Sequence, residues 1–562
     1  MVELFQSRKN LQTRLSAIFY GVLVVLILQA CSGGSGISNS SSKAVVHGND
    51  SQTPSTLQET SVQIPSQWVQ TIRHVYTNEW TDIPVSSDAR LIHIAAAPLG
   101  DDVNPGTEAS PLRSFAKAKT LVRDGYPDRI LFRRGDTFVM VSGDSNFRNS
   151  GRSPREPFVM SYYGDLSLPR PKILSDTSGI NFIGTNLHDV AIIGLHFQGV
   201  PTPNPHWNSD PLLLNDPSNP TVTSAAYGIR WTVTTGQDLL IEDCFIERFN
   251  DDIDVEGGGN LDNTMKGIIL RRSVIVDAYS TGGDVLSGRA EGIYVAWAEQ
   301  VLIEQNIFDH NGWIDGVVGS IPNIYSHNIY ISQHNNPGTP DNPNFIVSEN
   351  MLMQAAATGT QFRTGGIFVN NLLYRCAQSL FIFGIGGRVV NNVVLNGKNV
   401  HEGHAEGNAA WGIVTNTAAA SGQVPALDPN YHLVMDGNIV AHSSAYDRPN
   451  SMAIGFRTDQ VGKIEWGKNI VYDWAHVVMD HISGTNYQWS EVMSQSAFPT
   501  QDGQTFVDPN RSLGTYNRDQ GTGVESADAF LAMSRQQSRT NWNSVYTASN
   551  VNQYFREGFT PR

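Results

Sequence analysis

Cysteine, charge and long hydrophobic runs are all scarce in this chain of 562 residues. Its three cysteines are Cys31, Cys244 and Cys376, so a disulfide framework cannot hold the fold together. Charged residues make up 16% of the chain, and acidic residues outnumber basic ones by 53 to 38. The resulting net charge of −15 argues against nucleic acid as a partner. It also means that a polyanionic substrate would need a local basic group or a metal ion.

The start of the chain has the form of a secretory signal. Basic residues precede the apolar run 18–28, which is too short for an ordinary membrane span and ends in Leu28-Gln29-Ala30-Cys31. This ending resembles the bacterial lipobox, which implies that residues 1–30 are removed and that Cys31 is lipidated. Ser32 follows the cysteine, which favours the outer membrane in proteins of this kind. We expect a lipid-anchored protein that faces the periplasm or the exterior.

Residues 31–65 are rich in serine, glycine and threonine and show no periodic pattern. Such a segment buries too little apolar surface to fold, so it is predicted to be a flexible tether. The roughly 500 residues that follow are long for one compact domain, unless the domain is built from repeats.

Two short patterns alternate along the middle of the chain. The first is a strand whose central residue is usually isoleucine, and it occurs at 228–231, 252–255, 292–295, 328–331, 359–362, 379–382 and 412–415. The second is an apolar strand that ends in a polar turn, and one residue of this turn is usually asparagine. This position holds Asn306, Asn350, Asn371, Asn392, Asn438 and Asn469, preceded by Cys244 and Ser273.

The shortest spacing of this asparagine is 21 residues, and longer intervals contain insertions rich in glycine, proline and asparagine. A period near twenty with loops at fixed points indicates a solenoid, and short β-branched strands indicate a β-helix. Asparagines stacked at one turn can hydrogen-bond to the coils above and below, and asparagine tolerates a left-handed backbone there. Cys244 and Cys376 fall in different repeats, so we predict no disulfide.

The asparagine ladder and the paired strands resemble the pectin-lyase-like superfamily, which implies a right-handed parallel β-helix. The stretch 100–107, followed by Ser110-Pro111, is similar to the beginning of many of its members. Ser110 and Pro111 are predicted to start a capping helix that buries Leu112, Phe115, Ala118 and Val122. We expect the cap and first coil at 66–135, the β-helix at 136–483, and a small helical segment at 484–562. The helices near 527–537 and 551–556 are expected to cover the C-terminal end or to pack along the side.

The candidate site lies on the first strand set. If each central isoleucine faces the core, its neighbours face outward, and coils about 4.8 Å apart align them into a stripe. The stripe collects acidic, aromatic and basic residues over about four coils: Asp251, Asp252, Asp254, Glu291, Tyr294, His327, Asn328, Tyr330, Gln361 and Arg363.

Each residue of the stripe has a structural interpretation as well as a functional one. The tyrosines can be cross-strand packing partners, His327 can cap a turn, and Arg363 can form a weak surface ion pair. As catalytic candidates we take His327, Tyr330, Tyr294, Arg363 and Glu291. As substrate-binding candidates we take Gln361, Asn328, Trp297 and Trp313, the last two because aromatic rings suit sugars.

Asp251, Asp252 and Asp254 place three like charges close together. A calcium ion that took several of their oxygens would relieve the repulsion, although solvated turn acids would explain the pattern equally well. These three residues are therefore the candidate metal ligands.

Three functions fit these residues, and we expect a monomer that acts on or binds a polysaccharide. A polysaccharide lyase acting by β-elimination on a uronate-containing glycan is favoured, with Arg363 neutralising the carboxylate and His327 with Tyr330 or Tyr294 as base and acid. A glycoside hydrolase would pair Glu291 with Asp252 or Asp254. A non-catalytic glycan-binding lipoprotein needs only the surface. Polygalacturonase-type hydrolases are disfavoured, because their Gly-Asp-Asp sequence is replaced by Asn250-Asp251-Asp252.

Overall fold

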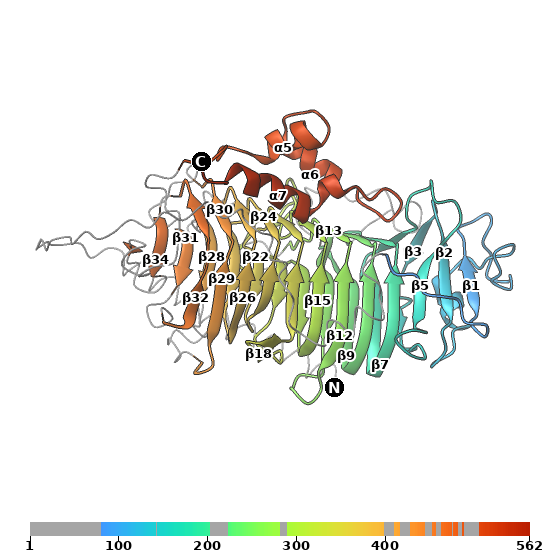
Figure 1. Ribbon diagram of the computed structural model, residues 1–562. Helices are drawn as coiled ribbons and strands as arrows, with labels where there is room; N and C mark the ends of the chain where they lie inside the picture. Colours follow the sequence, from blue (N-terminus) through green and yellow to red (C-terminus); the bar gives the residue numbers. More distant parts are fainter. Residues whose placement is uncertain are drawn as a thin grey trace, which may run out of the picture. The chain divides into compact units, whose positions relative to one another are not determined.

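The computed structural model describes residues 80–562 except 142, 203–222, 282–288, 398–409, 416–427, 444–451, 457–461, 475, 481–485 and 488–504. Over these residues the chain forms a right-handed parallel β-helix, as predicted, with coils stacked along one axis (Figure 1). The signal 1–30, with its lipobox cysteine Cys31, and the tether 31–65 lie outside the described residues. No helix in the described part of the chain is long and apolar enough to cross a membrane.

Each coil contributes strands to three faces. Face 1 contains β4 (Asn146–Phe147), β11 (Phe249–Glu256), β14 (Glu291–Ala296), β17 (His327–Ile331), β22 (Thr358–Phe362), β25 (Gln378–Ile382), β28 (Trp411–Thr415), β31 (Met452–Phe456) and β34 (His476–Asp480). Face 2 contains β1 (Leu91–Ile94), β2 (Arg129–Arg133), β5 (Phe158–Tyr163), β12 (Met265–Arg271), β15 (Ala298–Glu304), β20 (Phe345–Ser348), β23 (Gly366–Val369), β26 (Gly386–Val390), β29 (His432–Asp436) and β32 (Ile464–Trp466).

Face 3 is a separate 11-stranded sheet. It contains β3 (Thr137–Met140), β6 (Lys172–Ser175), β8 (His196–Gly199), β10 (Phe245–Glu247), β13 (Val274–Val276), β16 (Ile307–Asp309), β21 (Met351–Met353), β24 (Leu372–Tyr374), β27 (Val393–Leu395), β30 (Ile439–Ala441) and β33 (Ile470–Tyr472). Faces 1 and 2 are joined by β7 (Ser178–Ile193) and β9 (Ala225–Glu242), which run through both. An inserted hairpin comprises β18 (Gly338–Thr339) and β19 (Asn342–Pro343), and β35 (Asn486–Tyr487) pairs antiparallel to β34.

The register of face 1 confirms the predicted strand alignment. The central residues of the seven predicted strands are partners in one column: Ile229, Ile253, Ile293, Ile329, Thr360, Leu380 and Ile413. All of them are buried, because the interior between the three faces is filled by stacked apolar side chains.

The asparagine ladder is present at the turn between faces 2 and 3. The backbone N–H of Asn350 donates to Oδ1 of Asn371 at 2.9 Å, and the N–H of Asn371 donates to Oδ1 of Asn392 at 2.9 Å. Each amide nitrogen also donates to a backbone carbonyl, as Asn371 does to Val347. The bonds continue through Asn438 to Asn469 at one end and through Ser273 to Cys244 at the other. The ladder thus satisfies buried polar groups at every coil.

The left-handed residue of this turn is not the ladder asparagine itself, as the sequence interpretation supposed. It is the residue just before it, which has a positive φ in coil after coil: Asp243, Arg272, Gln305, Glu349, Asn370, Asn391 and Gly437. The ladder residue must instead turn its side chain inward, so the residue before it adopts the left-handed backbone conformation.

Cys244 and Cys376 are both buried and free, which confirms that they form no disulfide. The N-terminal cap buries the predicted residues Leu112, Phe115, Ala118 and Val122.

The predicted start of the capping helix is wrong. Helix α3 spans Phe115–Lys119, and its N-cap is Ser114, whose side chain accepts a bond from Lys117 N–H. Ser110 lies in a tight turn with Thr107. The helix begins late because Leu112 forms a parallel bridge with Ile94 of β1, which keeps the backbone extended through that residue.

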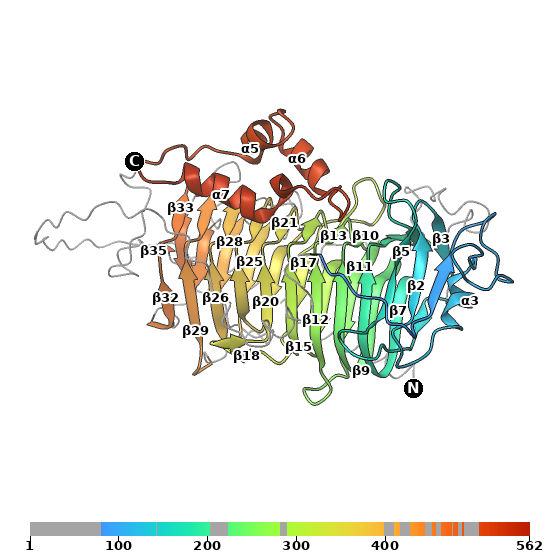
Figure 2. The same ribbon diagram turned by 45° about the vertical axis from the view of Figure 1, so that its right-hand side comes forward.

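The C-terminal segment packs along the side of the β-helix, over face 3, and Figure 2 shows its helices lying across these strands. It contains α5 (Leu513–Gln520), α6 (Ala527–Ser534), the 3-10 helix η3 (Ser544–Tyr546) and α7 (Ala548–Gly558). Its aromatic residues form one apolar cluster with the outward side chains of face 3. Arg535 adds ion pairs to Asp277 at 2.9 Å and to Asp309 at 2.5 Å.

The two ends of the described chain meet beside face 3. The rings of Trp80 and Trp542 pack edge to face with centroids 5.3 Å apart, and Arg539 donates to the carbonyl of Thr81 at 3.0 Å. Thr81 in turn donates to Glu242, which is fully buried and paired with Arg271. The first described residues are therefore held by the segment between α6 and η3 and by the middle of the β-helix.

Candidate active site

The position before each central residue of face 1 points inward, not outward. At Gly228, Gly292 and Gly359, which hold this position, an added Cβ would touch core side chains. The register of face 1 skips the position, because each strand bends there at the corner with face 3. The strict alternation of inward and outward residues therefore fails at this point of every coil.

Asp252 and Asn328 occupy this inward position, so the prediction that they face outward is wrong. Both are fully buried. Asn328 accepts a bond from Asn311 at 2.9 Å and donates to the carbonyl of Met353 at 3.1 Å. Asp252 accepts a bond from Phe249 N–H at 3.2 Å, and burial raises its pKa well above the ordinary value. Neither side chain is placed to touch a ligand on face 1.

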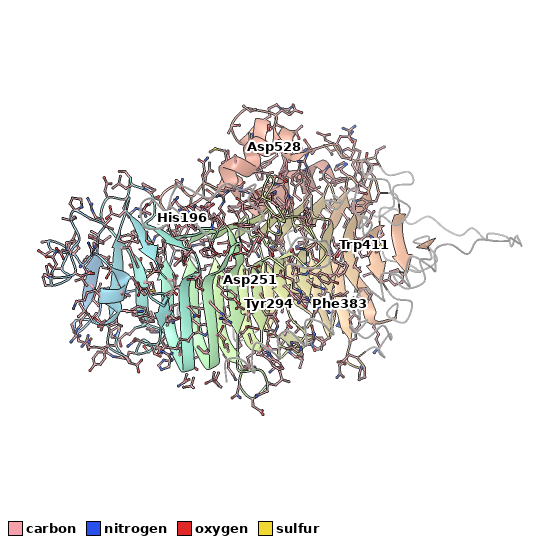
Figure 3. All side chains as sticks on the ribbon, turned by 180° about the vertical axis from the view of Figure 1, so that it is seen from behind. His196, Asp251, Tyr294, Phe383, Trp411 and Asp528 are labelled. Atoms are coloured by element: carbon pink, nitrogen blue, oxygen red, sulfur yellow. The ribbon has the colours of Figure 1, made fainter. Side chains whose placement is uncertain are left out.

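The other predicted catalytic residues do come together on face 1. One outward column runs through Asp254, Tyr294, Tyr330 and Gln361, which are register partners on successive coils. A second column, at the edge toward face 3, runs through Asp251, Glu291 and His327. Figure 3 shows Asp251 and Tyr294 on neighbouring coils of this face. Arg363 follows the end of β22 and completes the cluster.

Gln361 links His327 to Arg363. A guanidinium can only donate, so the amide oxygen of Gln361 faces Arg363 and accepts from its Nη2 at 3.0 Å and its Nε at 3.3 Å. The amide nitrogen then donates to Nε2 of His327 at 2.8 Å. The carboxamide thus joins a cationic group to an imidazole across one coil.

His327 is held in its neutral form. Its Nε2 accepts from the amide of Gln361, so the single proton of the neutral ring is on Nδ1, and protonation of Nε2 would set two donors against each other. Burial lowers the pKa of His327 well below the ordinary 6.5, and the charges of Arg363 and Arg289 lower it further. The ring therefore carries a basic lone pair at neutral pH.

Two tyrosines stand beside this histidine. The ring of Tyr330 lies edge to face with His327 at 5.2 Å and with Tyr294 at 5.3 Å. The guanidinium of Arg363 lies 5.6 Å from the centre of the Tyr330 ring. Burial, with Tyr330 nearby, raises the pKa of Tyr294, so its hydroxyl keeps its proton. Both hydroxyls belong to half-buried side chains that reach the surface of face 1.

Glu291 lies behind His327 in the second column. Its Oε2 accepts the backbone N–H of His327 at 3.0 Å, and only 4% of the residue is exposed. Burial raises the pKa of Glu291 well above its ordinary value, and the neighbouring charge of Asp251 adds to this effect. Glu291 therefore holds its proton to a higher pH than a solvent-exposed glutamate does.

The three candidate calcium ligands are not brought together. Asp252 faces the core, while Asp251 lies in the second column and accepts a bond from Asn250 at 3.1 Å. Asp254 is paired with Arg230 of the preceding coil at 3.1 Å. Among the described residues, no group of three or more histidine, cysteine, aspartate or glutamate side chains is arranged to hold a metal ion. The donor set does not fit a shared calcium site, and no step of the chemistry below is assigned to a metal.

The two tryptophans predicted to bind sugar are placed differently from each other. Trp297 is partly exposed at the bend between β14 and β15, but His334 stacks on its ring at 4.9 Å with an interplanar angle of 9°. Trp313 is 8% exposed, packs against His310 and donates from Nε1 to Asp315 at 3.1 Å. Trp297 thus borders the cluster, whereas the contacts of Trp313 place it at the base of its own loop.

Two arginines of this region were not among the predicted site residues. Arg230 occupies the outward position after the central Ile229, so the strand alignment itself contained the signal. It lies 4.3 Å from the ring of Tyr227 and pairs with Asp254. Arg289 precedes β14 outside the repeat, and no pattern in the sequence marks it. Its guanidinium lies 5.3 Å from the ring of Tyr325, and its charge acts on both His327 and Glu291.

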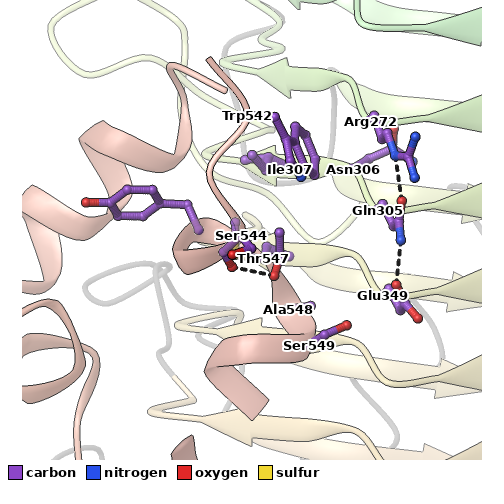
Figure 4. A pocket seen from close by; sticks show the side chains of 12 residues that line it. Arg272, Gln305, Asn306, Ile307, Glu349, Trp542, Ser544, Thr547, Ala548 and Ser549 are labelled. Atoms are coloured by element: carbon purple, nitrogen blue, oxygen red, sulfur yellow. Dashed lines mark hydrogen bonds between the residues drawn. The ribbon is translucent and has the colours of Figure 1, made fainter. Parts of the chain in front are cut away.

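A cavity of about 240 Å³ lies away from this cluster, where the turn between faces 2 and 3 meets the start of α7. Its floor is a chain of hydrogen bonds in which Arg272 donates to Gln305 and Gln305 donates to Glu349, both at 2.7 Å (Figure 4). Trp542 forms one wall. None of the predicted site residues lines it.

No protein-family model and no curated protein sequence matches the chain. Among solved structures it is similar to a GH136 lacto-N-biosidase from Eubacterium ramulus, with 11% identity and a TM-score of 0.38, over 70% of this chain and 64% of the biosidase. The match therefore spans less than two thirds of that protein. An alginate lyase from Paenibacillus matches at 12% identity and TM-score 0.35, over 71% of this chain and 98% of the lyase. A pectate lyase matches at 14% identity and TM-score 0.32, over 76% and 85%. Values this low assign no reaction.

Proposed function

We propose that this protein is a carbohydrate-active enzyme, a polysaccharide lyase that cleaves a uronate-containing glycan by β-elimination. The reaction needs a cation to neutralise the sugar carboxylate, a base to take the proton beside it, and an acid for the leaving oxygen. The observation that carries the proposal is the joining of a neutral imidazole to a guanidinium, His327 to Arg363, on the outer surface of face 1.

His327 is the proposed base. Burial raises the pKa of Glu291 and of Tyr294, which favours the protonated form of both groups. An arginine is always protonated. The neutral ring of His327 has a lone pair that can accept a proton, and it lies beside Arg363, the proposed carboxylate-binding group.

Arg363 binds the substrate carboxylate in the place now taken by the oxygen of Gln361. An incoming carboxylate offers Arg363 a charge-assisted bond, which is about twice as strong as a bond to a neutral amide. When the amide of Gln361 turns away, Nε2 of His327 loses its donor and becomes free to act. Substrate binding and activation of the base are coupled through one side chain.

In the chemical step, His327 takes the proton from the carbon next to the carboxylate. The electron pair of that C–H bond forms a carbon–carbon double bond, and the bond to the glycosidic oxygen breaks. Tyr330, held between His327 and Arg363, gives its proton to the departing oxygen. The products are an unsaturated uronate and a new free hydroxyl, so no water is consumed.

The test is a panel of uronate-containing and neutral polysaccharides, incubated with the protein and followed by ultraviolet absorbance. We expect an absorbing unsaturated product from a uronate-containing member and none from the variant His327→Ala. Arg363→Lys keeps the charge but loses the two-pronged geometry, so it should retain only a small part of the activity. New reducing ends without absorbance would contradict the proposal.

A glycoside hydrolase is the second candidate, because the raised pKa of Glu291 suits a general acid. Of its two proposed partners, Asp252 faces the core, which leaves Asp254. That residue is paired with Arg230, which favours its ionised form. The same panel separates the two reactions, since hydrolysis gives reducing ends without the double bond. Retention of the glycan without any product would favour a binding protein.

We also propose that the protein is anchored to the outer membrane by a lipid on Cys31 and acts as a monomer. The lipobox-like sequence and the serine-rich segment behind it support this proposal. Fatty-acid labelling of the wild type, and its loss in Cys31→Ser, would test the anchor. Light scattering of the protein without residues 1–31 would test the oligomeric state.

A further inference from the structure

The outer surface of face 1 changes character one coil beyond Gln361. The outward column that begins with Asp254 and the two tyrosines continues as Phe381 and then Val414. In the second column, the position held by His327 becomes Trp411 three coils later. The charged cluster is therefore followed along the axis by an apolar surface.

This surface, which we call the aromatic patch, consists of Phe381, Phe383, Trp411, Val414 and Met452. The rings of Phe381 and Trp411 are stacked with centroids 5.7 Å apart and planes 17° apart, and Phe383 meets Phe381 edge to face at 5.6 Å. Val414 and Met452 support them in a cluster separate from the interior core. The three rings are partly exposed. An apolar cluster outside the core, on a solvent-facing sheet, is typical of a binding surface.

The aromatic patch is continuous with the proposed active site. The guanidinium of Arg363 lies 5.6 Å from the Tyr330 ring on one side and 5.9 Å from the Phe383 ring on the other. The labels of Tyr294, Phe383 and Trp411 follow one another along the same face in Figure 3. A glycan whose carboxylate binds Arg363 and whose chain follows the axis therefore passes directly over the patch.

We propose that the aromatic patch binds neutral sugar residues of that glycan, so that the substrate is a mixed polysaccharide in which neutral sugars adjoin the cleaved uronate. The inference rests on the proposed lyase function. The apolar faces of neutral sugars pack well on aromatic rings, whereas a carboxylate pressed against them would lose its water without gaining a partner.

The first experiment compares two polymers of equal chain length. One is a homopolymer of uronate, such as polygalacturonate, and the other alternates uronate with a neutral sugar, as in the rhamnogalacturonan backbone. We expect kcat/KM for formation of the unsaturated product to be at least tenfold higher on the alternating polymer. Equal or faster cleavage of the homopolymer would overturn the inference and leave the lyase function standing.

The second experiment removes one ring. Trp411→Ala should lower kcat/KM on the alternating polymer about tenfold, as expected for the loss of one aromatic contact, while Trp411→Phe retains most of it. Trp542→Ala, a tryptophan beside the cavity near α7, is the matched control and should leave kcat/KM unchanged. Thermal melting of each variant shows whether it is folded. If Trp411→Ala melts at a lower temperature than the wild type, the comparison of kcat/KM between Trp411→Phe and the wild type decides the question. If Trp411→Ala prefers the alternating polymer as strongly as the wild type does, the inference is contradicted.

Measurements of polymer binding distinguish failure of the proposed lyase function from failure of the inference about the aromatic patch. If no polymer gives the unsaturated product, retardation of the protein in gels containing each polymer tests the patch alone. Stronger retardation by the alternating polymer, lost in Trp411→Ala, supports the patch as a neutral-sugar site. Equal retardation of both proteins refutes it.

Discussion

Burial and two guanidinium groups act on His327 in the same direction, and both lower its pKa. A group whose pKa is lowered keeps its basic form at more acid pH. We therefore expect kcat/KM to stay level from neutral pH down through 6.5 and to fall only below that value. His327→Ala should lose about a thousandfold in kcat, within the range for a general base.

Arg289→Ala provides a sharper check of this pH dependence. It removes one of the two cations, so the pKa of His327 should rise and the acid limb of the profile should move to higher pH. A pH–rate profile of Arg289→Ala that superimposes on the wild type would contradict the role of His327 as base. Arg113→Ala, an exposed arginine beside the N-terminal cap, serves as the control and should not shift the profile.

Gln361→Glu should disable the proposed site while changing little of its volume. The new carboxylate would form a two-pronged pair with Arg363 and compete with the substrate carboxylate for it. We expect KM to rise at least tenfold, measured by initial rates of the unsaturated product. Gln361→Ala is the comparison, because it removes the carboxamide without adding a charge and should affect KM much less. An unchanged KM in Gln361→Glu would show that Arg363 does not bind the substrate carboxylate.

The buried Asp252 leads us to expect an unusual dependence of the protein's stability on pH. The pKa of Asp252 is raised in the folded state. The stability that its protonated carboxyl contributes is therefore fully present below the pKa of the unfolded state and is lost as the pH rises through the pKa of the folded state. Asp252→Asn has no proton to lose, so its free energy of unfolding should exceed that of the wild type by at least about 1 kcal/mol at pH 8. The difference should vanish near pH 4. Denaturant unfolding at both pH values measures it, and a constant difference would refute the argument.

Among the elements, the strand columns and the asparagine turn were predictable because each coil repeats the same contacts. Ile253, Ile293 and Ile329 face the same interior, so one residue type recurs at one spacing. The bend before them was not predicted, because a glycine has no side chain that indicates a direction, and an aspartate or asparagine beside a central isoleucine is expected to face outward when strict alternation is assumed. Assigning strict alternation to the strand therefore put Asp252 and Asn328 on the wrong side.

The asparagine ladder should be costly to interrupt in the middle. Asn371 accepts the N–H and amide bonds of Asn350 and donates to Val347 and Asn392, and all four bonds are buried. Asn371→Ala would leave several polar groups unsatisfied and should cost about 3 kcal/mol of unfolding free energy. Asn550→Ala, on the exposed side of α7, is the matched control and should change it by less than about 0.5 kcal/mol. Equal effects in denaturant unfolding would contradict the structural role of the ladder.

At the scale of the whole molecule, the proposed reaction assigns neutralisation of the substrate to arginine. Of the three aspartates that suggested calcium, Asp252 faces the core and Asp254 is paired with Arg230, whereas Arg363 lies beside His327, the proposed base. We expect the rate of unsaturated product to change by less than about twofold after dialysis against EDTA, since Arg363 supplies the charge-assisted bond. Loss of the activity, and its recovery on addition of calcium, would contradict this prediction.

The position of the C-terminal helices could not be predicted from the sequence. Apolar residues at helical spacing predict that a helix such as α7 is covered on one side, but they do not say by what. The outward side chains of face 3 are as apolar as a core, and this became visible only when they were stacked on successive coils. The side of a β-helix that needs a cover is therefore determined by the column of outward side chains that successive coils build, and not by the sequence of any one strand.

The same cover bears on how the protein is made. The helices that cover face 3 belong to the last residues of the chain, and a ribosome completes them after every strand that they touch. Arg539 and Trp542, between α6 and η3, also contact Thr81 and Trp80, so the first described residues cannot complete their contacts until this segment has been made. Until these helices are made, the growing chain carries an uncovered apolar sheet on face 3, and such a surface is prone to aggregation. The segment that contains α5, α6 and α7 thus removes the largest exposed apolar surface of the half-made molecule.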